Sequence, residues 1–274
     1  MYTTYWKLNS RPFDNSTAPR FYYPSETHQA TLLKLRYAVE NRRGAALMAG
    51  ASGLGKTLLV QSLFDELSDE YRPFVHLKFP QMPPAQLVSF LADELTGEVS
   101  LDSAIDYNLR RIEDALAKNV DDGAHALVVI DEAHLLPDVG AMETVRLLLN
   151  FEPGWTLLLV AQPALLPALE RMPQLEERFG VKCLLRRFTV DESVSYIHHR
   201  MIAAGAANIE SVFDPSALEM IHQLSDGIPR RINRLCDLSL LIGFAEEQPR
   251  ITPKQVDAVA EELAGTAPPM RRVA

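Results

Sequence analysis

The sequence predicts an α/β fold in which a parallel five-stranded sheet flanked by helices is followed by an all-helical domain. Three observations support it. Short apolar runs alternate with helical patterns up to about residue 188, which is typical of parallel sheets with helices on both faces. From Asp191 onward only amphipathic helical patterns remain. Residues 50–57, Gly-Ala-Ser-Gly-Leu-Gly-Lys-Thr, match the phosphate-binding loop that joins a strand to a helix.

The core and its borders follow from the periodicity. The run 126–130 is fully apolar and β-branched, as a central parallel strand should be. The expected strands are Ala45–Ala49, Pro73–Phe79, Ala126–Ile130, Trp155–Ala161 and Lys182–Leu185, and the expected helices are 26–41, 56–70, 84–96, 103–119, 139–150 and 163–172. We therefore expect an N-terminal linker segment over residues 1–25, an α/β core over 26–188, a helical lid over 189–264 and a disordered tail over 265–274.

Four amphipathic helices are expected in the lid, at Asp191–Ala204, Asp214–Ser225, Pro229–Glu246 and Thr252–Leu263. Asp191, Asp214 and Thr252 are suited to cap helix N-termini, and the last two precede a proline at the first helical position. Gly205 and Gly227 are suited to helix ends.

The glycine-rich loop predicts a bound nucleotide. Its glycines let successive N–H groups face one phosphate chain, Lys56 adds a positive charge for the β- and γ-phosphates, and the Thr57 hydroxyl can ligate Mg²⁺. The predicted nucleotide-binding residues are Gly50, Ala51, Ser52, Gly53, Leu54, Gly55, Lys56, Thr57 and Leu58. The alternative is a glycine-rich surface turn, but the preceding apolar run and the following helical pattern favour the phosphate loop.

A second acidic motif follows the central strand. Asp131 is expected to hold Mg²⁺ and Glu132 to polarise the attacking water, because ligands bind at the carboxyl ends of parallel strands. The alternative is a strand that ends in a solvated acidic turn. Residues 131–134 also spell a helicase box, but the chain has room for one motor lobe only, so His134 is interpreted as a helix-start residue. No guanine-specific Asn-Lys-x-Asp segment is present, which favours ATP.

Bulk properties narrow the function classes. The net charge of −9 and pI near 5.3 argue against a large non-specific nucleic-acid surface but leave a local basic patch open. Cys183 and Cys236 fit neither a disulfide framework nor a metal site, which favours a reducing compartment. The most apolar stretch, 157–169, is interrupted by two prolines and a glutamine. We expect a cytoplasmic protein with no membrane span.

Several segments resemble a known group. The phosphate loop, the Asp-Glu strand and a late Gly-x-x-Arg resemble the AAA+ ATPases. The chain is more narrowly similar to the ExeA-type family, which comprises general secretion pathway protein A and relatives in pilus biogenesis and transposition. The resemblance extends over residues 2–263, and the segments that carry it are 5–13, 21–25 with His28, 147–152, 160–163 and 227–236.

The resemblance implies roles for two residues outside these motifs. Gln162 matches a "sensor 1" that orients the lytic water, which an amide can do because it both donates and accepts. The alternative is a glutamine that caps the helix begun by Pro163. Arg230 matches a "sensor 2" that contacts the γ-phosphate and reports its loss to the lid, and the alternative is a solvated basic helix face.

Arg178 matches the position from which AAA+ proteins supply an arginine finger to a neighbouring copy. Arg146 and Arg186 are rival candidates, and the alternative for each is an exposed structural arginine. Arg20, Tyr22 and Tyr23 could pack near the adenine or simply anchor the N-terminal segment.

The sequence is compatible with three functions. The first is an ATPase that binds ATP with Mg²⁺, assembles with itself into a ring or filament, and remodels a partner complex in a secretion, pilus or exopolysaccharide system. The second is a transposition-type DNA-binding assembly ATPase, suggested by Arg110-Arg111, Arg186-Arg187 and the cluster 230–234. The third is a nucleotide-gated scaffold with negligible turnover.

Overall fold

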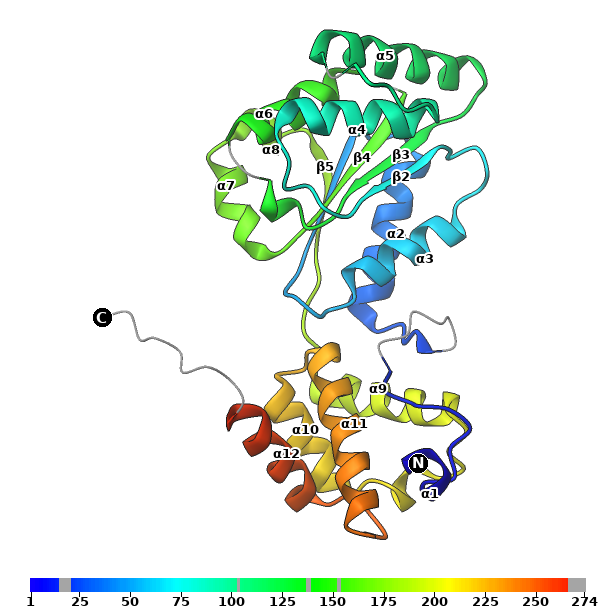
Figure 1. The fold of residues 1–274 in the computed structure, drawn as a ribbon, viewed down its shortest axis with the longest axis vertical. Coiled ribbons are helices and arrows are strands. Elements are labelled where there is room, and N and C mark those ends of the chain that lie inside the picture. Colours follow the sequence, from blue (N-terminus) through cyan, green and yellow to red (C-terminus); the bar gives the residue numbers. More distant parts are fainter. Residues whose placement is uncertain (15–20, 103, 137–138, 152–153, 266–274) are drawn as a thin grey trace, which may run out of the picture. The chain divides into compact units, whose positions relative to one another are not determined.

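The computed structural model describes residues 1–14, 21–102, 104–136, 139–151 and 154–265 (Figure 1). Its contacts divide the chain into two compact units. Unit 1 contains the described residues of Met1–Ser25, Gly53–Gly55 and Arg187–Ala274, and unit 2 contains those of Glu26–Ser52 and Lys56–Arg186. Arg20 and the predicted tail beyond residue 265 lie outside the described residues.

Unit 2 is built on the predicted parallel sheet. Its five strands are β1 (Ala45–Ala49), β2 (Phe74–Leu77), β3 (Ala126–Ile130), β4 (Trp155–Ala161) and β5 (Phe179–Leu184). They lie in the order β2-β3-β4-β1-β5, and every pair is parallel. β1, β3 and β4 are buried along their whole length, which explains why their sequences are continuously apolar.

Helices cover both faces of this sheet. They are α2 (Glu26–Glu40), α3 (Lys56–Glu66), α4 (Pro84–Thr96), α5 (Ile105–Asp121), α6 (Val139–Leu148), α7 (Leu166–Glu170) and α8 (Pro173–Glu176), with 3₁₀ turns η2 (Ala133–Leu135), η3 (Leu149–Phe151) and η4 (Pro163–Leu165). Figure 1 shows α2 and α3 on one side of the sheet and α4 and α5 on the other. Alternate strand residues such as Leu47 and Val128 pack with α4 to α8 in one apolar cluster. Burying each such side chain contributes about 1.5–3 kcal/mol.

Several expected elements of unit 2 have other bounds in the structure. For example, α3 ends at Glu66 rather than at residue 70, and β2 covers Phe74–Leu77 rather than residues 73–79. Two further elements differ as follows. The expected helix over 163–172 is divided into η4 and α7, each with a proline in its first turn, because proline cannot continue a preceding helix. The expected strand over 182–185 begins earlier, at Phe179, which pairs with Ala45 across a register irregularity. Gly180, the second residue of this strand, weakens the strand signal at its start.

The helices of unit 1 are α1 (Tyr2–Tyr5), α9 (Val190–Ala203), α10 (Pro215–Ser225), α11 (Pro229–Ala245) and α12 (Pro253–Gly265), with the 3₁₀ turn η5 (Ile209–Ser211). Asp214 caps α10 as predicted, accepting from the Ser216 N–H at 3.0 Å. The expectation for Asp191 is wrong. Thr189 caps α9 instead, in a capping box with Glu192, and this box satisfies two otherwise unpaired N–H groups.

The described N-terminal residues are part of this helical unit. Trp6 donates its indole N–H to the Leu240 carbonyl at 2.9 Å, and the Asn9 N–H donates to the Ala204 carbonyl at 2.7 Å. Tyr2, Trp6, Leu8 and Phe13 are buried in the same apolar cluster as α9 to α12. The N-terminal segment therefore completes the core of unit 1. Within the described residues, no helix has the combination of length and apolar composition that crossing a bilayer requires.

Candidate functional site

Strand order brings the predicted motifs of unit 2 to one edge of the sheet. Gly50 follows β1, Asp131 follows β3 and Gln162 follows β4, and these three strands are neighbours. The Gly50 N–H donates to the Ala161 carbonyl at 3.1 Å, which fixes the start of the phosphate loop to the end of β4. Because the carboxyl ends of parallel strands share an edge, motifs far apart in the sequence meet there.

The glycine-rich loop has the conformation that its sequence predicts. Gly53 and Gly55 have φ of +84° and +88°, a left-handed region that side chains disfavour. α3 begins at Lys56. The Lys56 side chain is buried, and its Nζ donates to the carbonyls of Gly50 at 3.0 Å and Ala51 at 3.2 Å. The ammonium group is therefore held within the curve of the loop.

The two predicted metal ligands are in contact. The Thr57 hydroxyl donates to Asp131 Oδ2 at 2.9 Å, and the Glu132 N–H donates to Asp131 Oδ1 at 2.8 Å. A hydroxyl and a carboxylate are both oxygen ligands, which Mg²⁺ prefers, and Mg²⁺ commonly takes its other ligands from phosphates and water. The donor set therefore fits Mg²⁺.

His76 is a second partner of Asp131, and it is not among the residues predicted from the sequence. It lies on β2, beside β3, and its Nε2 is 3.4 Å from Asp131 Oδ2. Burial acts to raise the pKa of Asp131, but hydrogen bonds from His76, Thr57 and the Glu132 N–H outweigh burial and hold that pKa below its usual value. The carboxyl group is thus ionised at neutral pH, as a metal ligand must be. The one available signal was a histidine inside an otherwise apolar strand.

Glu132 lies in the left-handed region at φ +50°, which is uncommon outside glycine and is found at functional sites. Its Oε2 is 3.4 Å from His134 Nε2. The Gln162 N–H donates to the other ring nitrogen, His134 Nδ1, at 3.4 Å. His134 lies within η2, as a helix-start residue would, but its ring also connects the ends of β3 and β4. Nothing in the sequence pattern predicts this contact.

Gln162 occupies the N-terminal cap position of η4, but its side chain makes no capping hydrogen bond. The capping alternative is therefore not what its amide does in this structure. Its role as a sensor of the lytic water stays a prediction.

Arg178 lies at the amino ends of the strands, whereas the phosphate loop lies at their carboxyl ends. It directly precedes β5, whose first residue, Phe179, pairs with the first residue of β1. The five residues of β1 span roughly 16 Å, which separates Arg178 from the loop of its own chain. Its side chain is exposed and donates to Asn150 Oδ1 at 3.0 Å. The rival Arg146 is ion-paired with Glu143 at 2.6 Å.

Several predicted residues belong to unit 1, among them Arg230, Tyr23 and the loop residues Gly53–Gly55. Arg230 is an exposed residue in the first turn of α11. Its main-chain N–H donates to the Gly53 carbonyl at 3.3 Å. Tyr23 packs edge-on against Phe188 and Tyr196, with ring centroids 5.8 and 5.9 Å away. These contacts are those of an aromatic anchor, the second of the two roles considered for Tyr23.

Comparison with known proteins agrees with this geometry. A family model described as an AAA domain matches residues 39–169. General secretion pathway protein A of Aeromonas hydrophila is 31% identical over 272 residues, covering 97% of this chain and 49% of that protein. The chain is a member of the ExeA-like AAA+ family. This AAA+ protein spans about half the length of the curated relative that it matches.

Solved structures agree on the fold. The Aeropyrum pernix ORC2 protein in its ADPNP–ADP complexes has a TM-score of 0.69 and 18% identity, covering 95% of this chain and 73% of that one. Cdc6p from Pyrobaculum aerophilum has a TM-score of 0.71 and 17% identity, covering 92% and 70%. Such low identities establish the fold alone. They confirm the predicted parallel sheet of the AAA+ type with a following helical region.

Proposed function

We propose that this AAA+ protein binds ATP with Mg²⁺, hydrolyses it, and uses the cycle to assemble with copies of itself and to remodel a partner protein complex. The observation that carries the proposal is the meeting of Thr57 and Asp131 at 2.9 Å, with Lys56 held in the adjoining loop and Glu132 next in the chain. The name of the Aeromonas relative supports a role linked to secretion, and the ADPNP–ADP complexes of ORC2 support a nucleotide ligand. A cytoplasmic location stays a prediction.

Each side chain has a distinct task in this proposal. Lys56 and the loop N–H groups, from Gly50 to Leu58, bind the phosphates, while Thr57 and Asp131 hold the metal. Mg²⁺, when bound with the nucleotide, neutralises charge on the β- and γ-phosphates. Glu132 orients and polarises the attacking water, Gln162 aligns it, and Arg230 responds to the γ-phosphate. The hydrogen bond from Arg230 to the Gly53 carbonyl supports the last role.

Assembly supplies the remaining group. Arg178 is exposed and lies at the amino ends of the strands, opposite to the carboxyl ends that carry its own phosphate loop, which supports a role toward a neighbouring copy. We propose that it acts as the arginine finger in trans, where such a residue stabilises the charge that develops on the phosphate.

The DNA-binding alternative is less well supported. One of the arginines that suggested it, Arg111, contacts Asp93 at 2.6 Å, Asn108 at 2.9 Å and Thr96 at 3.0 Å. Since its donors already serve this network, the pair Arg110-Arg111 offers one readily available cation rather than two. The overall charge of −9 also opposes a large phosphate-binding surface.

The decisive experiment measures ATP binding and steady-state hydrolysis for four proteins: wild type, Lys56→Ala, Glu132→Gln and the exposed control Glu177→Gln. Lys56→Ala should lose both binding and turnover. Glu132→Gln should retain ATP and lose at least about 10²-fold in turnover, because it lacks the general base. The control should match wild type. Wild-type turnover in Glu132→Gln would refute the mechanism, and ATP binding without turnover in wild type would favour the scaffold.

A further inference from the structure

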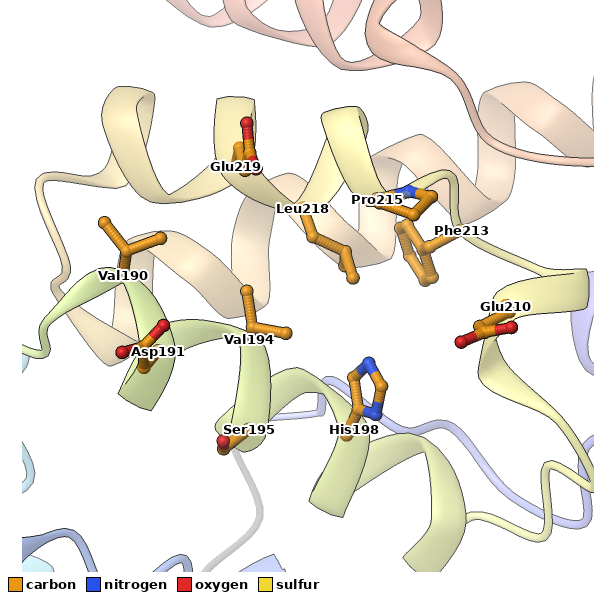
Figure 2. A pocket seen from close by; sticks show the side chains of 10 residues that line it. All are labelled: Val190, Asp191, Val194, Ser195, His198, Glu210, Phe213, Pro215, Leu218 and Glu219. Atoms are coloured by element: carbon orange, nitrogen blue, oxygen red, sulfur yellow. The ribbon is translucent and has the colours of Figure 1, made fainter.

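A groove in unit 1 lies between α9 and α10, beside η5 (Figure 2). Its volume is about 380 Å³. Its floor is apolar, since Val194 from α9 faces Leu218 from α10, and Phe213 closes one end. His198 also stands in the floor, where burial lowers the pKa of its ring although Glu210 acts to raise it, so the ring is neutral at neutral pH. The floor therefore suits apolar side chains.

The lining of this groove is otherwise acidic. Asp191, Glu210 and Glu219 are exposed and carry three negative charges at neutral pH, and no lysine or arginine is among the described residues that line the groove. A complementary surface must therefore combine apolar side chains with flanking cations, because like charges placed opposite each other oppose association.

Unit 2 carries such a surface on the outer face of α2. Leu33 and Tyr37 are 68% and 48% exposed, and residues four apart lie side by side on a helix. Arg43 donates to the Tyr37 hydroxyl at 3.2 Å, and Lys34 is exposed beside Leu33. We call this surface, made of Leu33, Lys34, Tyr37 and Arg43, the α2 ridge. The nearby side chains of Arg36 and Glu40 form an ion pair at 2.7 Å, and their opposite charges cancel. The charge of the ridge is therefore positive, because Lys34 and Arg43 remain.

We propose that the lid groove of one copy receives the α2 ridge of a second copy. This inference rests on the self-assembly in the proposed function and names two surfaces that form it. The apolar pair fills the groove, while Lys34 and Arg43 face its carboxylates. Because the two surfaces differ, the contact is head-to-tail, and repetition of a head-to-tail contact produces a ring or a filament. The charges select the partner surface, and the apolar pair supplies most of the affinity.

Charge reversal in the full chain tests this contact. The groove variant is Glu210→Lys with Glu219→Lys, and the ridge variant is Lys34→Glu with Arg43→Glu. Sedimentation velocity with a non-hydrolysable ATP analogue measures the concentration at which half the protein is assembled. Each variant should raise that concentration about tenfold or more, because like charges then face each other. Leu33→Gln should also raise it, by removal of apolar contact from a residue that is exposed in the single chain.

Mixing supplies the sharpest result. An equimolar mixture of groove and ridge variants should assemble near the wild-type concentration. When the two variants alternate, an intact groove meets an intact ridge and a reversed groove meets a reversed ridge, so opposite charges face each other at every contact. The control Glu261→Lys with Glu262→Lys makes the same charge change as the groove variant on exposed positions of α12 and should not alter assembly. Circular dichroism and analogue binding verify that every variant is folded.

Three outcomes overturn the inference. Assembly that is insensitive to both reversals means that these surfaces are not the contact. Restoration when all four substitutions share one chain, but not in the mixture, places the contact within a single chain. A wild type that never assembles refutes the inference together with the proposed self-assembly, whereas an assembling wild type with unaffected variants refutes the inference alone.

Discussion

His134 uses both nitrogens of one ring to connect two strand ends. The Gln162 N–H donates to Nδ1 at 3.4 Å, and the other ring nitrogen, Nε2, lies 3.4 Å from Glu132 Oε2. The ring therefore lies between the Gln162 N–H and the Glu132 carboxylate. A glutamate side chain kept in place by such a contact can stay oriented toward a bound water, whereas a freely rotating side chain has that orientation only part of the time.

We expect His134→Ala to lower kcat roughly tenfold, in the range for residues that orient a reacting side chain, and to leave the Kd for ATP unchanged. His134→Gln should recover most of the rate, since an amide can donate to Glu132 and accept from the Gln162 N–H. Single-turnover hydrolysis and nucleotide titration separate the two quantities. An unchanged kcat in His134→Ala would show that the contact has no part in hydrolysis.

The meeting of Gly50, Asp131 and Gln162 at one sheet edge could be foreseen from the sequence, because each directly follows an apolar strand of a parallel sheet. Their catalytic roles stay predictions. His76 and His134 could not be foreseen in the same way. His76 meets Asp131 because β2 pairs with β3 in a particular register, and His134 meets Gln162 because η2 turns back toward β4. Register between strands is a property of packing rather than of either segment.

The elements that the sequence located well have strong local signals, and α10 is an example. Asp214 and Pro215 mark its start, and Asp214 accepts from both the N–H and the hydroxyl of Ser216 at 3.0 and 2.6 Å. The helices that the sequence located poorly or not at all lack such signals or have competing ones. At α9, Thr189 with Glu192 outcompetes Asp191. α1 has only four residues and is too short for a helix to be stable without tertiary packing.

Because Asp214 caps α10, the free energy of unfolding of unit 1 should depend on pH in the acidic range. The hydroxyl and then the N–H of Ser216 lower the pKa of Asp214, so its folded value lies below its unfolded value of about 3.9. This contribution is therefore complete above about pH 3.9 and is lost as pH falls through the folded pKa.

We expect Asp214→Asn to keep the cap, because its amide oxygen still accepts, and to lose only the acid-dependent part of the stability. Thermal unfolding across this pH range should show wild type and variant converging as the pH falls. Asp214→Ala should instead have a lower Tm at every pH. Parallel curves for wild type and Asp214→Asn would contradict the assignment. The exposed pair that Asp214 makes with Arg250 at 3.5 Å contributes little.

At the scale of the whole molecule, the position of Arg178 predicts that the nucleotide site is completed by a neighbour. We expect Arg178→Ala to bind ATP like wild type but to lose about 10³-fold in turnover, the lower end for arginine fingers. Mixing Arg178→Ala with Lys56→Ala should restore part of the activity, because one partner has an intact phosphate loop and the other an intact Arg178.

The control for this complementation is Arg171→Ala, an exposed arginine elsewhere in unit 2. It should hydrolyse ATP like wild type. If the mixture stays as inactive as its components, Arg178 does not act across copies, and Arg186 becomes the next residue to test.

The strand order β2-β3-β4-β1-β5 also governs when this molecule can acquire its site during synthesis. Once residue 130 has emerged, β2 and β3 can pair, but β1 still has no neighbour, because its partners are β4 and β5. Only when Trp155–Ala161 inserts between β3 and β1 do the phosphate loop and the acidic motif become adjacent. A nascent chain therefore exposes an unpaired apolar strand for more than a hundred residues of elongation, and folding must wait for a contact of high sequence separation.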